Sequence, residues 1–327
     1  MTATEWIAYQ REKLGFSEYS ILKIDQSDYK SPLAGSVMSR LADLSPAERD
    51  DRQIQILVAA MRASGEPEDK QVLDSVHIAV FPTYEVEGLA TRTPKGDRII
   101  LLHSGLLLTL THLSLLELYQ QKRGGQLGKQ EFLAALAEIA AVWQQSEDDN
   151  VAPESPALDL RLVDEASLLF AGSMMQTALI FILGHEIGHV IAEDGPYSNT
   201  DAGANHKKEL YADQWGLVFA LKNVFTNIAR LESDRLPACR YALLGPFLAL
   251  GMIAMLSPKQ SLTHPAPSTR RDQVLALLNR ITELPIGQQA FTVLENLMGD
   301  TGLKQVAGMG SKLFERLQMY NQITDSL

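Results

Sequence analysis

The chain has 327 residues, and 46% of them are hydrophobic, so it can bury a large core as one elaborated domain or as two closely packed ones. The formal net charge of −11 is spread along the sequence, which argues against nucleic acid and against an anionic membrane surface as partners. Cys239 is the only cysteine, and this excludes an intrachain disulfide framework.

The first seven residues lack the basic start and the apolar stretch of a signal peptide, so the cytoplasm is the expected location. Over residues 1–75, helical patterns alternate with turn signals, which predicts a helical region. A helix start is expected at Ser45-Pro46, and a helix end is expected within residues 64–67.

Two strands are predicted next, at residues 76–81 and 98–103, because both are short runs rich in β-branched and aliphatic side chains. Turn-forming residues at 93–97 precede the second strand. Farther along, residues 131–143 have an apolar helical pattern, and a polar linker follows at residues 144–156. A plain surface linker is the common case for such a segment, with a lid or a nicking site as the alternative.

The next predicted helix carries the most informative residues. Residues 178–184 are continuously apolar, and the sequence His-Glu-Ile-Gly-His follows, beginning at His185. Because residues four apart share one helix face, His185 and His189 can bind a single metal ion. Glu186 lies about 100° round the helix from His185, within reach of a metal-bound water that it could deprotonate as a general base. The alternative for an isolated match of this kind is a pair of ordinary surface or core histidines.

A tetrahedral catalytic zinc site needs a third protein ligand and leaves its fourth position to water. The metzincin pattern does not supply that ligand, because it requires Gly and His where this chain has Ala192 and Gly195. Turn-forming residues at 193–203 end the helix, and a second helical pattern begins near Asn205.

Two acidic residues of this second pattern, Glu209 and Asp213, lie one helical turn apart. On their own they also fit an exposed acidic helix face. His206 shares the face of Glu209 and is a competing third ligand, although we favour a loop or substrate-side position for it.

The spacing of these motifs resembles that of the gluzincin metallopeptidases. Residues 209–213 match the form Glu-x-x-Ala-Asp, which resembles the Lit-like (phage-exclusion) and Ste24-like groups. The resemblance implies that Glu209 is the third zinc ligand and that Asp213 orients the ring of His185. A carboxylate commonly does this for a metal-bound histidine, because it accepts the second ring N–H and fixes the tautomer.

A third segment, residues 261–270, resembles the Thr-His-Pro element and following Arg of the same peptidases. The resemblance implies that His264 lies near the metal, where it would stabilise an oxyanion, and that Arg270 belongs to the same site. Arg271 departs from the pattern, since the family usually has an aliphatic residue there. The alternative is a proline-punctuated loop with an incidental histidine.

Residues 87–90 stand where the family places an edge strand, with Glu87 and Gly88 in place of its Asn and Ala, and residues 104–107 match its helix entry. The resemblance implies that this edge binds a protein substrate in extended form through backbone hydrogen bonds.

Residues 241–256 are the best candidate for a membrane span. They are 16 residues long and contain Gly-Pro, which is short of the roughly 20 residues that a bilayer requires. A buried core helix is therefore expected, which favours the Lit-like group over the membrane-embedded Ste24-like one.

The sequence thus predicts a mainly helical α+β fold with zincin-type active-site helices and a small edge sheet or hairpin. We expect an N-terminal helical region at 1–75, a zinc metallopeptidase core at 76–275 with an insert at about 109–167, and a C-terminal helical region at 276–327. The expected zinc ligands are His185, His189 and Glu209. The expected catalytic residues are Glu186 and His264, and the expected supporting residues are Asp213 and Arg270.

The expected function is a zinc-dependent endopeptidase that cleaves an intracellular protein, with no nucleic-acid or membrane partner. One alternative is a latent effector or toxin peptidase that an activating partner switches on. The other is a zinc-stabilised binding protein that does not cleave.

Overall fold

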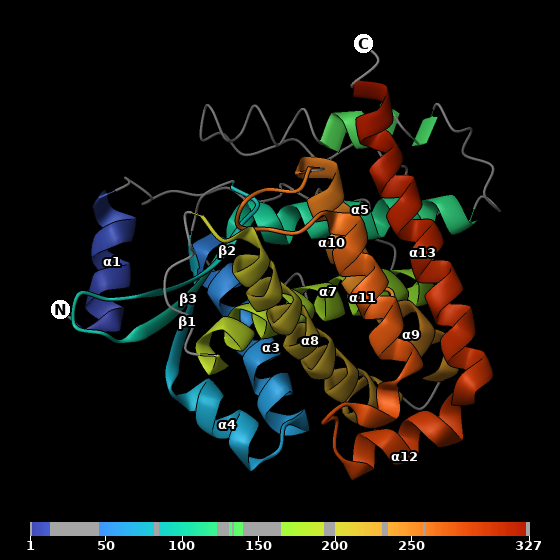
Figure 1. Ribbon diagram of the computed structural model, residues 1–327, viewed down its shortest axis with the longest axis horizontal. Coiled ribbons are helices and arrows are strands. Elements are labelled where there is room, and N and C mark those ends of the chain that lie inside the picture. Colours follow the sequence, from blue (N-terminus) through green and yellow to red (C-terminus); the bar gives the residue numbers. More distant parts are fainter. Residues whose placement is uncertain are drawn as a thin grey trace. The chain divides into compact units, whose positions relative to one another are not determined.

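The computed structural model describes residues 2–13, 46–81, 85–122, 131–132, 134–139, 165–192, 200–230, 235–257 and 259–324. These residues are mainly helical and include one three-stranded sheet, so the expected mainly helical α+β fold is confirmed (Figure 1). The predicted linker at 144–156 lies outside the described residues. Of the apolar stretch before it, residues 131–132 and 134–139 are helical.

The chain forms two compact units. The first comprises Met1–Leu57 and Val76–Ala171, and the second comprises Val58–Ser75 and Gly172–Leu327. The two units are defined by contacts within the fold, and their boundaries differ from those of the three expected regions. The division into three regions therefore stays a prediction.

The sheet of the first unit has the order β1-β3-β2. β1 (Val76–Phe81) runs parallel to β3 (Arg98–His103), and β2 (Gly88–Arg92) pairs antiparallel with β3. The predicted strands coincide with β1 and β3, and the predicted edge segment leads into β2. The turn between β2 and β3 contains Gly96 at φ 92°, a left-handed conformation that glycine adopts without strain.

Within the first unit, helices pack against this sheet and contact its edge strand β1. α1 (Ala3–Lys13) places Ala3 and Ile7 in a buried cluster with side chains of β1 and β3. Asp51, on α3 (Pro46–Ser64), accepts the backbone N–H of Val80 at 3.2 Å. Arg11 donates to the carbonyl oxygen of the same residue, so side chains occupy this point of the edge strand β1. α5 (Ser104–Lys122) begins directly after β3 and is almost wholly buried.

Two long helices organise the second unit: α7 (Glu165–Ile191), which enters it at Gly172, and α8 (Ala202–Thr226), which lies across it (Figure 1). Small residues allow their backbones to approach closely. A Cβ atom on Gly188 would lie 2.7 Å from Cα of Ala212, and one on Gly216 would lie 2.5 Å from the carbonyl oxygen of Phe181. No side chain larger than hydrogen fits at either glycine without movement of the helices.

The remaining elements of the second unit are helical. They are α4 (Pro67–Asp74), η3 (Ile228–Arg230), α9 (Arg235–Ala242), α10 (Gly245–Leu256), α11 (Pro267–Asn279), η4 (Ile281–Glu283), α12 (Gln288–Leu297) and α13 (Gly299–Thr324). α10 packs on α13, where Gly251 faces Leu317 and Gly310 faces Phe247. A buried ion pair at 2.5 Å joins Lys222 of α8 to Asp69 of α4.

The apolar segment 241–256 is buried as expected, but it is not one helix. α9 ends at Ala242 and α10 begins at Gly245. Pro246 explains the break, because proline is tolerated in the first turn of a helix but not in its interior.

Within the described residues, two segments are long and apolar enough to cross a membrane by length and composition, Ser167–Ile191 and Leu236–Leu256. Their most apolar windows are 67% and 78% buried, and a core helix of a soluble protein meets the same criterion. The first segment holds the histidines discussed below, and the second contains the break between α9 and α10.

Candidate metal centre

The close crossing of α7 and α8 brings together residues that are far apart in the sequence. α7 presents His185 and His189 on one face, as their spacing predicts. α8 begins at Ala202, where Asp201 caps the helix by accepting the backbone N–H of Ala204 at 2.9 Å. Because Gly188 lies against Ala212, the carboxylate of Glu209 reaches the histidine face of α7.

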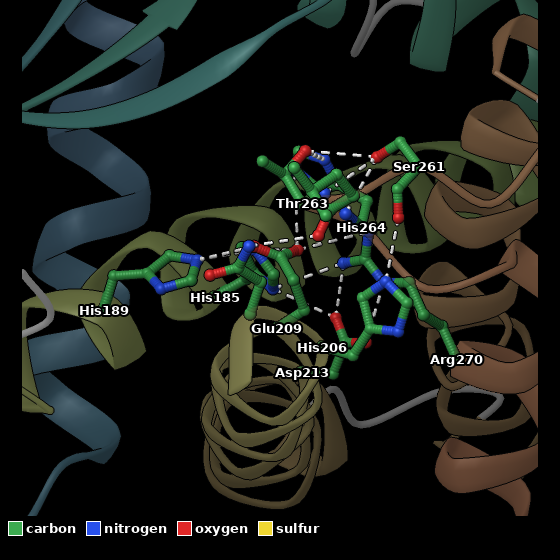
Figure 2. Close-up of polar contacts among 11 residues, drawn as sticks. His185, His189, His206, Glu209, Asp213, Ser261, Thr263, His264 and Arg270 are labelled. Carbon is green, nitrogen blue, oxygen red and sulfur yellow. Dashed lines mark hydrogen bonds and ion pairs between the residues drawn. The ribbon is translucent and has the colours of Figure 1, made fainter. Parts of the chain in front are cut away.

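Three side chains form a small triangle at this crossing. Nε2 of His185 lies 3.1 Å from Nε2 of His189, and the two nitrogens lie 3.6 and 3.5 Å from the two carboxylate oxygens of Glu209. Figure 2 shows the two rings and the carboxylate turned toward one another. The carboxylate of Glu209 is almost completely buried, while both rings retain a little exposure.

This triangle fits a tetrahedral zinc site. Ligand bonds of about 2.0–2.1 Å at tetrahedral angles separate ligand atoms by about 3.3 Å, close to the three distances within the triangle. Two imidazoles and one carboxylate also form the ligand set of catalytic zinc, which keeps a fourth position open. Among the described residues, His185, His189 and Glu209 form one of the groups able to hold a metal ion.

Asp213 and Arg270 support the ring of His185 from behind. Nδ1 of His185 donates to Oδ1 of Asp213 at 3.0 Å, which leaves Nε2 with the lone pair that a metal needs. Arg270, in the first turn of α11, donates to both oxygens of Asp213, at 2.8 and 2.6 Å. Arg270 also lies 3.8 Å from Glu209. One buried cation thus contacts both buried carboxylates and balances one of their two negative charges.

The charges of this group set its protonation. Burial alone would raise the pKa of Asp213, but the charge and hydrogen bonds of Arg270 outweigh it and hold that pKa well below its usual range. Burial lowers the pKa of His185, but the hydrogen bond and the negative charges of Asp213 and Glu209 outweigh it and leave that pKa raised. A cation at Nε2 of His185 therefore competes with a proton.

His264 approaches the triangle from the loop that precedes α11. Its Nε2 lies 3.7 Å from Oε2 of Glu209, and about half of its side chain is exposed. Burial and the positive charge of Arg270 lower its pKa, which favours the neutral ring at neutral pH. The structure therefore brings this sequence-predicted residue to the site, on the side that solvent can reach.

Glu186 is buried and follows His185 on α7. It is near enough to Arg270 for its charge to contribute to the raised pKa of that guanidinium. All seven residues expected at the site thus lie on α7, α8, the loop after residue 260 and α11, and all belong to the second unit.

The competing ligand His206 has a different partner. Its Nε2 donates to the carbonyl oxygen of Ser261 at 2.9 Å. Asn205, beside it, donates to the carbonyl oxygen of Leu262 at 3.1 Å. Sequence reasoning did not single out Asn205 or Ser261, and no spacing signal marks them. Thr263 belongs to the Thr-His-Pro element, and its hydroxyl lies 2.8 Å from Nδ1 of His264.

Arg271 departs from the family pattern and has a specific environment here. Its guanidinium lies 4.9 Å from the ring centroid of Phe314 on α13 and pairs with Asp272 at 2.6 Å. The aromatic face and the carboxylate satisfy a charge where the family usually has an aliphatic side chain.

A second group of potential ligands lies in the first unit, at Glu85, Glu87 and His103. Both carboxylates are exposed, and that of Glu85 pairs with Nδ1 of His103 at 3.0 Å. A hydrogen-bond contact between Glu85 and His103 at the end of the sheet thus engages two of its three members.

Comparison with known proteins bears directly on this geometry. Residues 129–286 match the family model of peptidase U49. The match covers just under half of the chain and includes every residue of the triangle and its supports. It supports a peptidase function. Searches of curated proteins and of solved structures gave no match.

Proposed function

We propose that the protein is a zinc-dependent endopeptidase that cleaves an intracellular protein. The observation that carries the proposal is the triangle of His185, His189 and Glu209 inside a region that matches a peptidase family. The distances within the triangle suit zinc, and imidazole with carboxylate is a ligand set that zinc accepts readily.

In this proposal each remaining residue has one task. Zinc, when bound, would polarise the scissile carbonyl and lower the pKa of a water molecule. Glu186 would take a proton from the attacking water and later give it to the leaving amine. His264 donates from Nε2 to the carbonyl oxygen as negative charge develops on it. Asp213, held by Arg270, keeps the ring of His185 in the tautomer that binds metal.

The substrate is proposed to be a protein segment in extended form, and the cytoplasm is the proposed location. β2 is an edge strand of its sheet, and an edge strand can add an extended peptide through backbone hydrogen bonds. Cys239 is the only cysteine, so the chain cannot form an intrachain disulfide and its fold does not require an oxidising compartment.

The test compares new protein N-termini in bacterial cells that express the chain with those in cells that express Glu186→Ala at equal level. Glu186→Ala removes the base and keeps all three ligands, so it isolates cleavage from metal binding. A small set of N-termini found only with the intact chain would establish an endopeptidase and identify its substrate. Identical profiles, with zinc bound in both proteins, would contradict constitutive cleavage and favour a latent peptidase or a non-cleaving binding protein.

A further inference from the structure

The loop that carries His264 is a compact turn closed by its own hydrogen bonds. The backbone N–H of Ser261 donates to the carbonyl oxygen of His264 at 2.9 Å, and the N–H of His264 donates to Oγ of Ser261 at 2.9 Å. The N–H of Thr263 donates to the same hydroxyl at 3.3 Å. These bonds shape the turn but do not fix its position relative to the metal ligands.

Burial of residues 261–264 contributes little to that position. The side chain of Leu262 is 43% exposed, and about half of the side chain of His264 is exposed. Residues 261–264 gain little from packing, and Pro265 directly after them is buried, so polar contacts with a neighbouring element are needed to place the exposed part of the turn.

Those contacts come from the first turns of α8, the helix that carries Glu209. His206 and Asn205 donate to the carbonyl oxygens of Ser261 and Leu262, at 2.9 and 3.1 Å. Figure 2 shows the ring of His206 below the loop, joined to Ser261. Asn205 is fully buried, so its side chain has one fixed direction.

We propose that His206 is a positioning residue, which together with Asn205 sets His264 against Glu209. The anchors and Glu209 lie within one turn of the same rigid helix, and the two hydrogen bonds connect that helix to the turn that carries the ring of His264. This arrangement gives Nε2 of His264 its 3.7 Å distance from Glu209. The inference rests on the proposed function and assigns His206 to the loop instead of the metal.

The test uses zinc-loaded full-length protein, a pool of fluorescence-quenched peptides and four single variants. His206→Leu removes the donor, and His206→Gln keeps an N–H near the position of Nε2. Lys207→Leu is the control for an apolar change on exposed helix surface, and His264→Ala removes the group that His206 serves. Zinc content, kcat, KM and amide hydrogen exchange over residues 261–264 are measured for each variant.

We expect His206→Leu to keep its zinc, to lose kcat on the order of tenfold with little change in KM, and to exchange the loop amides faster. His206→Gln and Lys207→Leu should stay near the parent protein. In His264→Ala, kcat should fall roughly 10²–10³-fold. Adding His206→Leu to His264→Ala should cause no further loss, because His206 acts through His264.

Loss of zinc in His206→Leu would overturn the proposal, because it would make His206 a ligand. The proposal would also be overturned if the loss of kcat in the double variant equalled the product of the losses in the two single variants. A His206→Gln variant with kcat as low as that of His206→Leu would overturn it as well. If the parent protein cleaves none of the peptides, the proposed function fails by itself. In that case amide hydrogen exchange over residues 261–264 tests the anchoring role of His206 without any activity. Unchanged exchange in His206→Leu would refute that role.

Discussion

Glu209 is a buried acidic residue at the centre of the site. Its carboxylate is almost fully buried between two imidazoles and within 3.8 Å of Arg270. Burial of a carboxylate is costly unless cations or donors surround it, so this position is built for a positive partner.

Replacement of Glu209 by Ala should therefore weaken zinc binding strongly. Loss of one of three ligands should lower zinc affinity at least as much as the roughly 10–100-fold that follows loss of an outer hydrogen-bond partner. Glu186→Ala is the matched control, because it removes a neighbouring carboxylate and no ligand. Metal content of the two purified variants checks this, and unchanged zinc in Glu209→Ala would give the third-ligand role to another group.

His112 offers a separate test in the first unit. It is buried in α5, and burial lowers its pKa to about 4. In the part of the chain that the structure describes, Nε2 of His112 has no hydrogen-bond partner. The unfolded chain binds a proton below about pH 6.5, while the folded chain resists it, so stability falls as the pH falls from about 6.5 toward 4.

Between pH 7 and pH 5 this histidine should cost about 2 kcal/mol of unfolding free energy. His112→Leu should lose that share of the pH dependence, since it cannot bind a proton. Urea unfolding at both pH values, followed for parent and variant, measures the difference. An equal slope in the two proteins would contradict the assignment.

At the scale of elements, the crossing of α7 and α8 determines the site. Gly188→Ala places a Cβ 2.7 Å from Cα of Ala212 and must push the helices apart. We expect a loss of about 1–3 kcal/mol in stability together with weaker zinc binding, because the ligands lie on both helices. Gly172→Ala on α7 is the control, since no atom lies within 4 Å of its added Cβ. Urea midpoints and zinc titrations compare them, and equal behaviour would refute the steric argument.

Some elements could be predicted from sequence because local patterns determine them. Residues 76–81 and 98–103 coincide with β1 and β3, since short aliphatic and β-branched runs between turns have few other solutions. The start of α8 was expected near Asn205 but lies at Ala202, because Asp201 caps it earlier. The break after Ala242 was missed, because an apolar run hides where one buried helix ends.

Some contacts of the site could likewise be predicted from the sequence, and others could not. The partners of a metal-binding helix follow from motif spacing, and the structure brings Glu209 and Asp213 to the histidines that the motif names. The partner of His206 could not be predicted, because it is a backbone carbonyl 55 residues away. Only the folded chain shows which carbonyl oxygen comes within reach of that ring.

For the whole molecule, zinc should act as a stabilising ligand. Its candidate ligands come from two helices, and His264 and Arg270 add a third segment, so binding favours the folded chain over the unfolded one. A zinc concentration 100 times the dissociation constant should add about 2.7 kcal/mol. Calorimetry before and after chelator treatment checks this. A shift of equal size in Glu209→Ala would contradict it.

The bond between Arg270 and Asp213 has a consequence for any shortened form of the protein. A chain that ended before α11 would keep His185, His189 and Glu209, yet two buried carboxylates would have lost their counter-charge. Asp213 would then take up a proton more readily, and a protonated Asp213 is a poor acceptor for the ring of His185. Such a fragment would fail through charge imbalance while its complete metal-binding motif remained in place.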